Sequence, residues 1–302
     1  MKKIILNLLI ISSIFIISNV EAQENYYVND NNVAITKEDY NYLLNDYSKE
    51  AIAKFTDSDL KIVLAKDYQK IGSIDKYYKT TYKKDEKGNV LKTSNIEVSK
   101  EDYDNGNIET KSSCGTNCVY YETTYKKLTL TINYGASVSV TRVDVKNEWK
   151  RIPSVKLYDI IGFKITSSNG AYWHFNSGGT YVAKQIYDGH TINYSYDTSS
   201  SGNTVRNLNG VGQVMNIVDS TSSSLENTMR MYLWGSPEGL SINASYQHAT
   251  SSRITKAKAK SASFGSASSR HTILGGTFKY TNRIASYYDG MPGVSLTFTS
   301  PF

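Results

Sequence analysis

In the middle of the chain, apolar and polar side chains alternate through Leu128-Thr129-Leu130-Thr131-Ile132-Asn133-Tyr134. Alternation with a period of two is typical of a β-strand with one buried face and one solvated face. A valine-rich run follows over 138–145, and short alternating runs recur to the C-terminus with Gly, Asn and Ser between them. We therefore expect a mainly β protein whose body is an antiparallel β-sandwich or jelly-roll-like structure.

The first 22 residues predict a secretory signal peptide. Lys2 and Lys3 precede the apolar run 4–17, and Val20 and Ala22 supply the small side chains expected before a cut after Ala22. The alternative is a retained membrane anchor, but the run is shorter than the roughly 20 residues that cross a bilayer. No second apolar run of that length follows. We expect a secreted, extracellular protein with no transmembrane segment after cleavage.

The remaining chain predicts a small α+β leader domain over 23–112 and a β-sandwich domain over 113–302. A helical pattern begins at Thr36-Lys37-Glu38-Asp39-Tyr40 and extends to about residue 68, and alternation over about 74–98 around Lys87-Gly88-Asn89 predicts a β-hairpin. One shared core is an alternative. The stretch Ser99-Lys100-Glu101-Asp102-Tyr103 repeats the pattern at 36–40, which indicates either a duplication or two independent helix starts.

The only two cysteines, Cys114 and Cys118, lie four positions apart. In an exported protein such a pair is expected to form a disulfide, because the environment is oxidising. The small loop removes little chain entropy, so we expect the bond to fix a turn. Metal binding would need two further soft ligands, and a redox role would need a C-x-x-C motif. We predict a structural disulfide.

Positive charge is concentrated in the second half of the chain. Residues 1–150 contain 21 Lys and Arg against 21 Asp and Glu, and residues 151–302 contain 13 against 7. Lys256, Lys258 and Lys260 share one face of an expected strand, either as a basic site for an anionic polymer or as protection of an edge strand. The chain has no nucleic-acid recognition module, so we expect no nucleic-acid partner.

The usual catalytic and metal-binding motifs are missing. The four histidines, His174, His190, His248 and His271, form no H-E-x-x-H pair, and no nucleophile elbow, phosphate-binding loop or dinucleotide fingerprint is present. We predict no metal site, no cofactor and no catalytic residue. A glycosidase brings its carboxylates together only in space, so a secreted hydrolase without a recognisable motif stays an alternative.

Tyrosine is unusually frequent, with 25 residues against 8 phenylalanines, and several occur as doublets. Neighbouring strand residues face opposite sides, so one ring of a doublet can enter the core while the other contacts solvent or a ligand. We predict that Tyr172, Trp173, His174 and Tyr181 form a ligand-binding site. The alternative is ordinary strand packing, in which tyrosine is favoured.

Two segments resemble an uncharacterised group of secreted proteins of Gram-positive bacteria. They are Glu148-Trp149-Lys150-Arg151-Ile152-Pro153-Ser154-Val155 and Tyr158-Asp159-Ile160-Ile161-Gly162-Phe163, with Ala34-Ile35-Thr36-Lys37-Glu38-Asp39-Tyr40 upstream. The resemblance covers about residues 26 to 165. It implies export and a helical segment before a β body, and it implies no activity, cofactor or catalytic residue.

These patterns predict a non-enzymatic extracellular or surface protein that acts by binding, with a glycan or a cell-wall polymer as the favoured ligand. Two alternatives belong to other classes. One is a secreted hydrolase. The other is a β-pore-forming toxin, because serine and threonine alternate loosely with small residues over 195–226, although the lipid-facing apolar half of that pattern is mostly missing.

Overall fold

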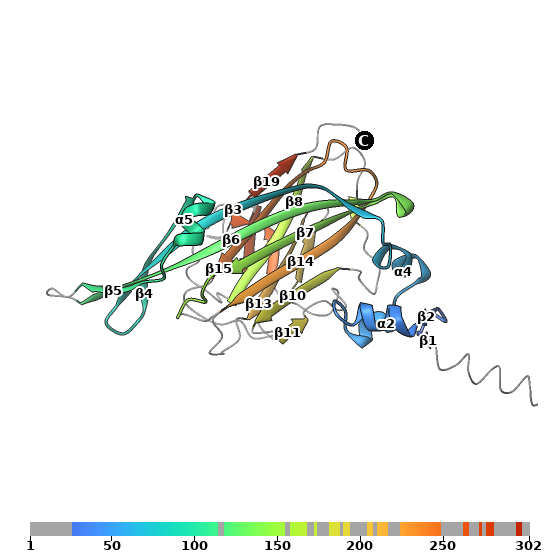
Figure 1. Ribbon diagram of the computed structural model, residues 1–302, viewed down its shortest axis with the longest axis horizontal. Helices are drawn as coiled ribbons and strands as arrows, with labels where there is room; N and C mark the ends of the chain where they lie inside the picture. Colours follow the sequence, from blue (N-terminus) through green and yellow to red (C-terminus); the bar gives the residue numbers. More distant parts are fainter. Residues whose placement is uncertain are drawn as a thin grey trace, which may run out of the picture.

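The computed structural model describes residues 26–113, 118–154, 158–167, 172–173, 181–187, 190–193, 204–207, 210–216, 224–248, 262–265, 272–273, 276–280 and 294–297. The protein is mainly β, with 59% strand and 16% helix. Large antiparallel sheets make up its body (Figure 1). The predicted fold class is confirmed.

The larger sheet has nine strands in the order β11-β10-β14-β7-β6-β3-β4, with β5 beside β6 and β9 beside β14. Each hydrogen-bonded pair in it is antiparallel. The strands are β3 (Tyr68–Asp85), β4 (Val90–Val98), β5 (Thr110–Ser113), β6 (Val119–Gly135), β7 (Val140–Trp149), β9 (Tyr172–Trp173), β10 (Val182–Tyr187), β11 (His190–Asn193) and β14 (Leu225–Trp234).

A five-stranded sheet in the order β12-β13-β8-β15-β19 lies against one face of the larger sheet. Its strands are β8 (Tyr158–Ser167), β12 (Thr204–Asn207), β13 (Gly210–Asn216), β15 (Ser241–His248) and β19 (Val294–Thr297). A three-stranded sheet is formed by β16 (Ala262–Gly265), β17 (Thr272–Ile273) and β18 (Gly276–Tyr280). The two larger sheets form the predicted sandwich.

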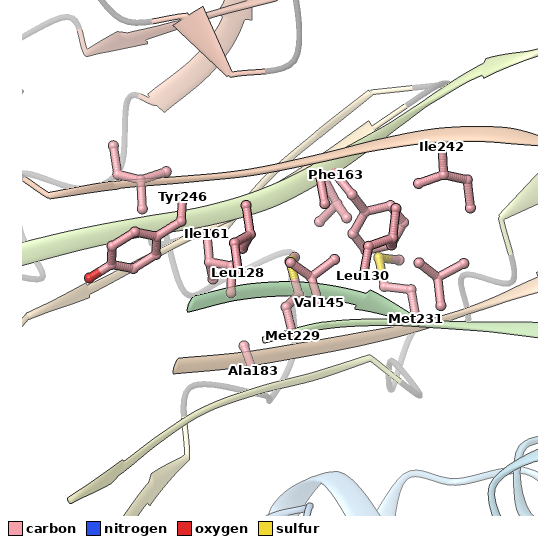
Figure 2. Close-up of a cluster of buried hydrophobic side chains, with 14 of the residues drawn as sticks. Leu128, Leu130, Val145, Ile161, Phe163, Ala183, Met229, Met231, Ile242 and Tyr246 are labelled. Atoms are coloured by element: carbon pink, nitrogen blue, oxygen red, sulfur yellow. The ribbon is translucent and has the colours of Figure 1, made fainter. Parts of the chain in front are cut away.

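The main hydrophobic core fills the space between these two sheets (Figure 2). Leu128, Leu130 and Ile132 on β6 are fully buried, whereas the residues between them are half-exposed. They meet Phe163 of β8 and Ile242 of β15 from the opposite sheet. The alternation along β6 therefore separates an inner face, which packs on the second sheet, from an outer face.

One end of the molecule is an extension that we call the arm, residues 77–113 and 118–125. Here β3 and β6 pair with β4 and β5, and the helix α5 (Lys100–Asn105) lies beside them (Figure 1). On the inner face, Tyr78 and Tyr82 still belong to the main core. The hairpin predicted around Gly88 is present, and Gly88 adopts a φ of 81° that favours glycine. Its strands belong to the nine-stranded sheet, because β3 pairs with β6.

The N-terminal helices lie at the opposite end of the long axis (Figure 1). The hairpin β1 (Tyr26–Val28) and β2 (Ala34–Thr36) precedes α2 (Lys37–Leu43), α3 (Lys49–Ala53) and α4 (Asp57–Val63). A second hydrophobic cluster packs these helices onto Val140, Val182 and Tyr232 on the outer face of the larger sheet. The helical region predicted to about residue 68 ends earlier, because β3 pairs with β6 from Tyr68 onward.

The pattern shared by residues 36–40 and 99–103 corresponds to two helix starts with the same kind of N-terminal cap. The side chain of Thr36 accepts a hydrogen bond from the backbone N–H of Asp39, and that of Ser99 accepts one from Asp102. Each cap satisfies an amide that a helix start leaves without a partner. Local capping chemistry therefore accounts for the repeated pattern.

Three sequence predictions fall wholly or partly on residues that the structure does not describe. Cys118 is described, but its predicted partner Cys114 lies outside the described residues, so the disulfide between the two stays a prediction. The lysine-rich stretch 253–261 and most of 195–226 also lie outside them. Among the described helices, none has the length and apolar character needed to cross a membrane.

Candidate functional site

A pocket of about 390 Å³ lies between α5 and the outer face of β3 and β6 in the arm. Its volume falls in the range of small-ligand sites, roughly 300 to 1,000 Å³. The lining residues are Lys79, Val98, Asp102, Asn105, Gly106, Asn107, Glu109, Thr123 and Tyr125. We call this the α5 pocket. Its wall comes from one short helix and the linker after it, and its floor comes from two long strands.

Helix α5 begins with a reciprocal cap. Ser99 Oγ accepts a hydrogen bond from the backbone N–H of Asp102 at 3.0 Å, and it donates to Asp102 Oδ2 at 2.7 Å. None of the residues of α5 is buried. A helix this short is unstable alone, so it depends on its caps and on the contacts beneath it.

Lys150 fixes the other end of α5. Its Nζ donates to the carbonyl oxygens of Tyr103 at 2.7 Å, Asp104 at 2.8 Å and Gly106 at 3.1 Å. An ammonium group at a helix C-terminus satisfies carbonyls that lack helical partners and interacts favourably with the helix dipole. A side chain at Gly106 would overlap the ring of Tyr125. Glycine therefore allows the chain to leave the helix in contact with the sheet.

Tyr103 joins α5 to the sheet. Its ring centroid lies 5.1 Å from that of Tyr77 and 6.3 Å from that of Tyr125, and Lys150 lies over the rings of Tyr103 and Tyr125. Burial, together with the nearby carboxylate of Glu148, raises the pKa of Tyr103 to about 12. Its hydroxyl therefore stays protonated at neutral pH, and the ring serves as the packing contact of the helix.

The α5 pocket presents hydrogen-bonding groups of several kinds. Asn105 and Asn107 are exposed, and their side-chain amides make no hydrogen bond to another described residue. Glu109 pairs with Lys111 at 2.6 Å, whereas no described carboxylate lies within ion-pair distance of Lys79. Amides, a carboxylate, an ammonium group and the ring of Tyr125 at the floor match a ligand rich in hydroxyl groups.

The carboxylates of the α5 pocket favour binding over hydrolysis. A glycosidase needs a general acid whose pKa is raised. The hydrogen bond and the charge of Lys111 lower the pKa of Glu109 instead. Asp102 is engaged by the cap of α5. Each carboxylate retains lone pairs that can accept a hydrogen bond from a ligand.

The structure places the residues of the predicted tyrosine site only in part. Tyr172 and Trp173 form β9 and pair with Trp234 and Leu233 of β14. Tyr181 is buried and donates a hydrogen bond to Gln213 inside the sandwich. His174 and the side chains of β9 lie outside the described residues. That site stays a prediction, and Tyr181 enters the core rather than presenting its ring to solvent.

A buried polar cluster lies inside the sandwich and was not predicted. His248 Nδ1 is 2.9 Å from Asp159 Oδ1, and Asn227 donates to Asp159 Oδ2 at 3.0 Å. Trp149 Nε1 donates to the hydroxyl of Tyr246 at 2.6 Å. These side chains are at most 3% exposed, so a substrate has no access to them. The cluster joins β8 and β15 to the larger sheet and has a structural role.

A second pair of charges is shielded in the arm. Lys84 forms an ion pair with Glu122 and contacts Ser154 Oγ, while Glu122 accepts from the backbone N–H of Ser154 at 2.8 Å. The carboxylate of Glu122 is the ion-pair partner of Lys84, and it also accepts a hydrogen bond from Ser154 Oγ at 2.7 Å. Because Glu122 also occupies the amide of Ser154, the group fixes the segment after β7 and does not resemble a catalytic dyad.

The part of the chain that the structure describes contains no group of three His, Cys, Asp or Glu side chains placed to hold a metal ion. No model of a known protein family matches the sequence, and a search among curated proteins finds no similar sequence. The candidate site is therefore defined by the geometry of the α5 pocket alone.

Proposed function

We propose that the protein is an extracellular binding protein that takes a glycan in the α5 pocket. The observation that carries this proposal is a pocket of about 390 Å³ that combines two unengaged amide side chains, Asn105 and Asn107, with a tyrosine ring. Sugar hydroxyls donate and accept hydrogen bonds, and amides do both. Tyr125 is only 6% exposed, so it forms the closed floor of the pocket, and the polar side chains around it supply the hydrogen bonds.

Export of the chain is part of the same proposal. The apolar run 4–17 and the small residues before position 23 support a secretory signal peptide, and the two cysteines support an oxidising environment. In that setting we expect a Cys114–Cys118 disulfide in the short connection between β5 and β6. The chain then acts outside the cell, where surface glycans and wall polymers are available.

A glycan array with the protein lacking residues 1–22 tests the proposal. We expect selective binding to a subset of glycans, and we expect the double variant Asn105→Ala, Asn107→Ala to lose about fivefold to 150-fold in affinity for them, since each lost hydrogen bond is worth about 0.5 to 1.5 kcal/mol. The matched control is Asn41→Ala, Asn45→Ala, which changes two exposed asparagines on α2 and in the turn that follows it. We expect the control to bind like the original protein.

Absence of binding to every glycan, by a sample that is folded by circular dichroism, would remove the proposal. Equal losses in the pocket variant and the control would also contradict it, because the pocket would then have no special part in binding. Turnover of a bound glycan would show that the site is catalytic and would replace binding with hydrolysis.

A further inference from the structure

Three lysines and one tyrosine form a row across the outer face of the arm. Lys83 of β3 lies directly opposite Lys92 of β4 on one side and Tyr121 of β6 on the other, and Tyr121 lies opposite Lys111 of β5. Directly opposed residues of antiparallel strands point to the same face. With strands about 4.8 Å apart, the row spans roughly 14 Å. We call it the lysine row.

The lysine row carries positive charge that its surroundings do not balance. Lys92 and Lys111 are exposed, Lys83 is half-exposed, and Tyr121 is 36% exposed. Among the described residues, no carboxylate lies within 4.0 Å of Lys83 or Lys92, and only Lys111 has an ion pair, with Glu109. Because like charges opposite each other destabilise a sheet, the Lys83–Lys92 pair lowers the stability of the folded protein.

The carboxylate at the end of β3 is already engaged in the turn to β4. Asp85, two positions beyond Lys83, accepts hydrogen bonds at 2.8 to 2.9 Å from the backbone N–H groups of Lys87 and Asn89 and from the side chain of Asn89. These bonds hold the turn between β3 and β4. A lysine at the edge strand can protect it from pairing with other chains, but Lys83 lies on an interior strand, where that explanation does not apply.

The lysine row is continuous with the α5 pocket. A parallel row of hydroxyl side chains lies two positions along the strands from the lysine row. It consists of Ser94, Thr81 and Thr123, and Thr123 also lines the pocket. Two residues further, Lys79 lies opposite Tyr125, and both line the pocket. The outer face of the arm thus presents ammonium groups, then hydroxyl groups, then the pocket, on one surface.

We propose that the lysine row binds the negative charges of an anionic polysaccharide whose sugar residue occupies the α5 pocket. This inference rests on the proposed function and adds the charge class of its ligand. A polymer that bears a carboxylate or phosphate on successive sugars places charges along the row while one sugar occupies the α5 pocket. Exposed aromatic and hydroxyl groups between the lysines match a sugar chain better than they match a metal ion or a small anion.

Equilibrium binding to polygalacturonate, a carboxylate polymer, and to uncharged pullulan tests this proposal, with the protein lacking residues 1–22. We expect binding to polygalacturonate that weakens as salt increases, because charge pairs exposed to solvent are screened. In the variant Lys83→Gln, Lys92→Gln we expect a loss of roughly tenfold to thirtyfold, since a lysine near an anionic surface contributes about 1 kcal/mol. The control Lys37→Gln, Lys49→Gln removes the same two charges from the N-terminal helices.

Each outcome decides the question. A loss confined to the lysine-row variant supports the proposal. Equal losses in the variant and its control would assign the effect to net charge and overturn it. Binding to uncharged glycans alone would overturn the lysine row and leave the α5 pocket as proposed, whereas binding to neither class would remove both. Binding to vesicles containing phosphatidylglycerol but not to polygalacturonate would identify a membrane surface as the partner and overturn the polysaccharide.

Discussion

Asp46 and Arg230 form an ion pair, with 2.6 Å between Asp46 Oδ2 and Arg230 Nη1, that joins the N-terminal helices to the outer face of the nine-stranded sheet. Arg230 Nε also binds Asp144 at 2.6 Å, and Lys184 contacts the second oxygen of Asp46. Asp46 lies in the turn between α2 and α3, so a single carboxylate connects those helices to β10 and β14.

Replacement of Asp46 with Asn is expected to destabilise the protein. Lys184 and Arg230 would lose a charged partner in a site that is largely shielded from solvent, and we expect the free energy of unfolding to fall by about 1 to 3 kcal/mol. Urea unfolding measures this change. The control Asp57→Asn removes the exposed Asp57–Lys61 pair, which is worth less than about 0.5 kcal/mol. Similar effects of both variants would contradict the role of Asp46.

The same carboxylate gives a pH dependence with a defined sign. Burial raises the pKa of Asp46, but the charges of Arg230 and Lys184 and their hydrogen bonds outweigh it and hold the pKa below its ordinary value. Because the pKa is depressed in the folded state, this stabilisation is present above the pKa of the unfolded chain and is lost as the pH falls through the folded value. The original protein should therefore lose more stability than Asp46→Asn between pH 5 and about pH 3. Identical slopes for the two proteins would exclude this contribution.

Gly106→Ala is expected to displace α5 from the sheet. The new methyl group would overlap the ring of Tyr125, so either the ring or the helix must move. We expect faster hydrogen exchange in residues 99–109 and weaker glycan binding, with a loss of stability of about 1 to 3 kcal/mol from the overlap. Gly88→Ala is the control for a glycine in a hairpin turn, where added atoms meet nothing within 4 Å but φ is positive. It should leave the exchange of α5 unchanged.

Lys150→Met tests the C-terminal cap of α5. Three carbonyl oxygens would lose a charged donor while the methionine keeps most of the packing on Tyr103 and Tyr125. We expect unfolding to become easier by about 1 to 3 kcal/mol and α5 to exchange its amide hydrogens faster. Lys150→Arg retains the charge, so its stability and its α5 exchange rate should lie between those of the original protein and of Lys150→Met. Unchanged exchange in α5 after loss of the charge would show that the helix is held by Tyr103 alone.

The core can be tested with one substitution at two sites. Leu130→Ala removes a fully buried side chain between the sheets and should cost about 2 to 5 kcal/mol. Leu91→Ala makes the same chemical change at a residue that is 57% exposed on β4 and should cost less than about 0.5 kcal/mol. Denaturant unfolding of both variants measures the difference. Comparable costs would contradict the inner and outer faces assigned here.

Period-two alternation predicted the strands and the inner face of β6. Both features follow from the order of apolar and polar residues within a single stretch of chain. Helix starts at Thr36 and Ser99 were equally local, since a cap and its amide lie three residues apart. In the doublet Tyr77-Tyr78, one ring enters the core and the other meets Tyr103 outside it, as expected for adjacent strand residues.

The α5 pocket could not be predicted, because its lining comes from positions as far apart as Lys79 and Tyr125. The cap by Lys150 joins residues more than forty positions apart, and neither partner belongs to a motif. Asn105-Gly106-Asn107 signals a turn but not what the turn covers. The lysine row depends on strand register, which follows from the pairing of four strands and not from the local pattern of any one of them.

Hydrogen exchange of the protein with and without a bound glycan tests the central claim most directly, because it locates the binding site on the chain. We predict slower exchange in residues 99–109 and in the stretch of β6 around Tyr125 when the glycan is present. Exchange that is unchanged there but slowed at β10 and β14, or at the N-terminal helices, would place the ligand elsewhere and contradict the account.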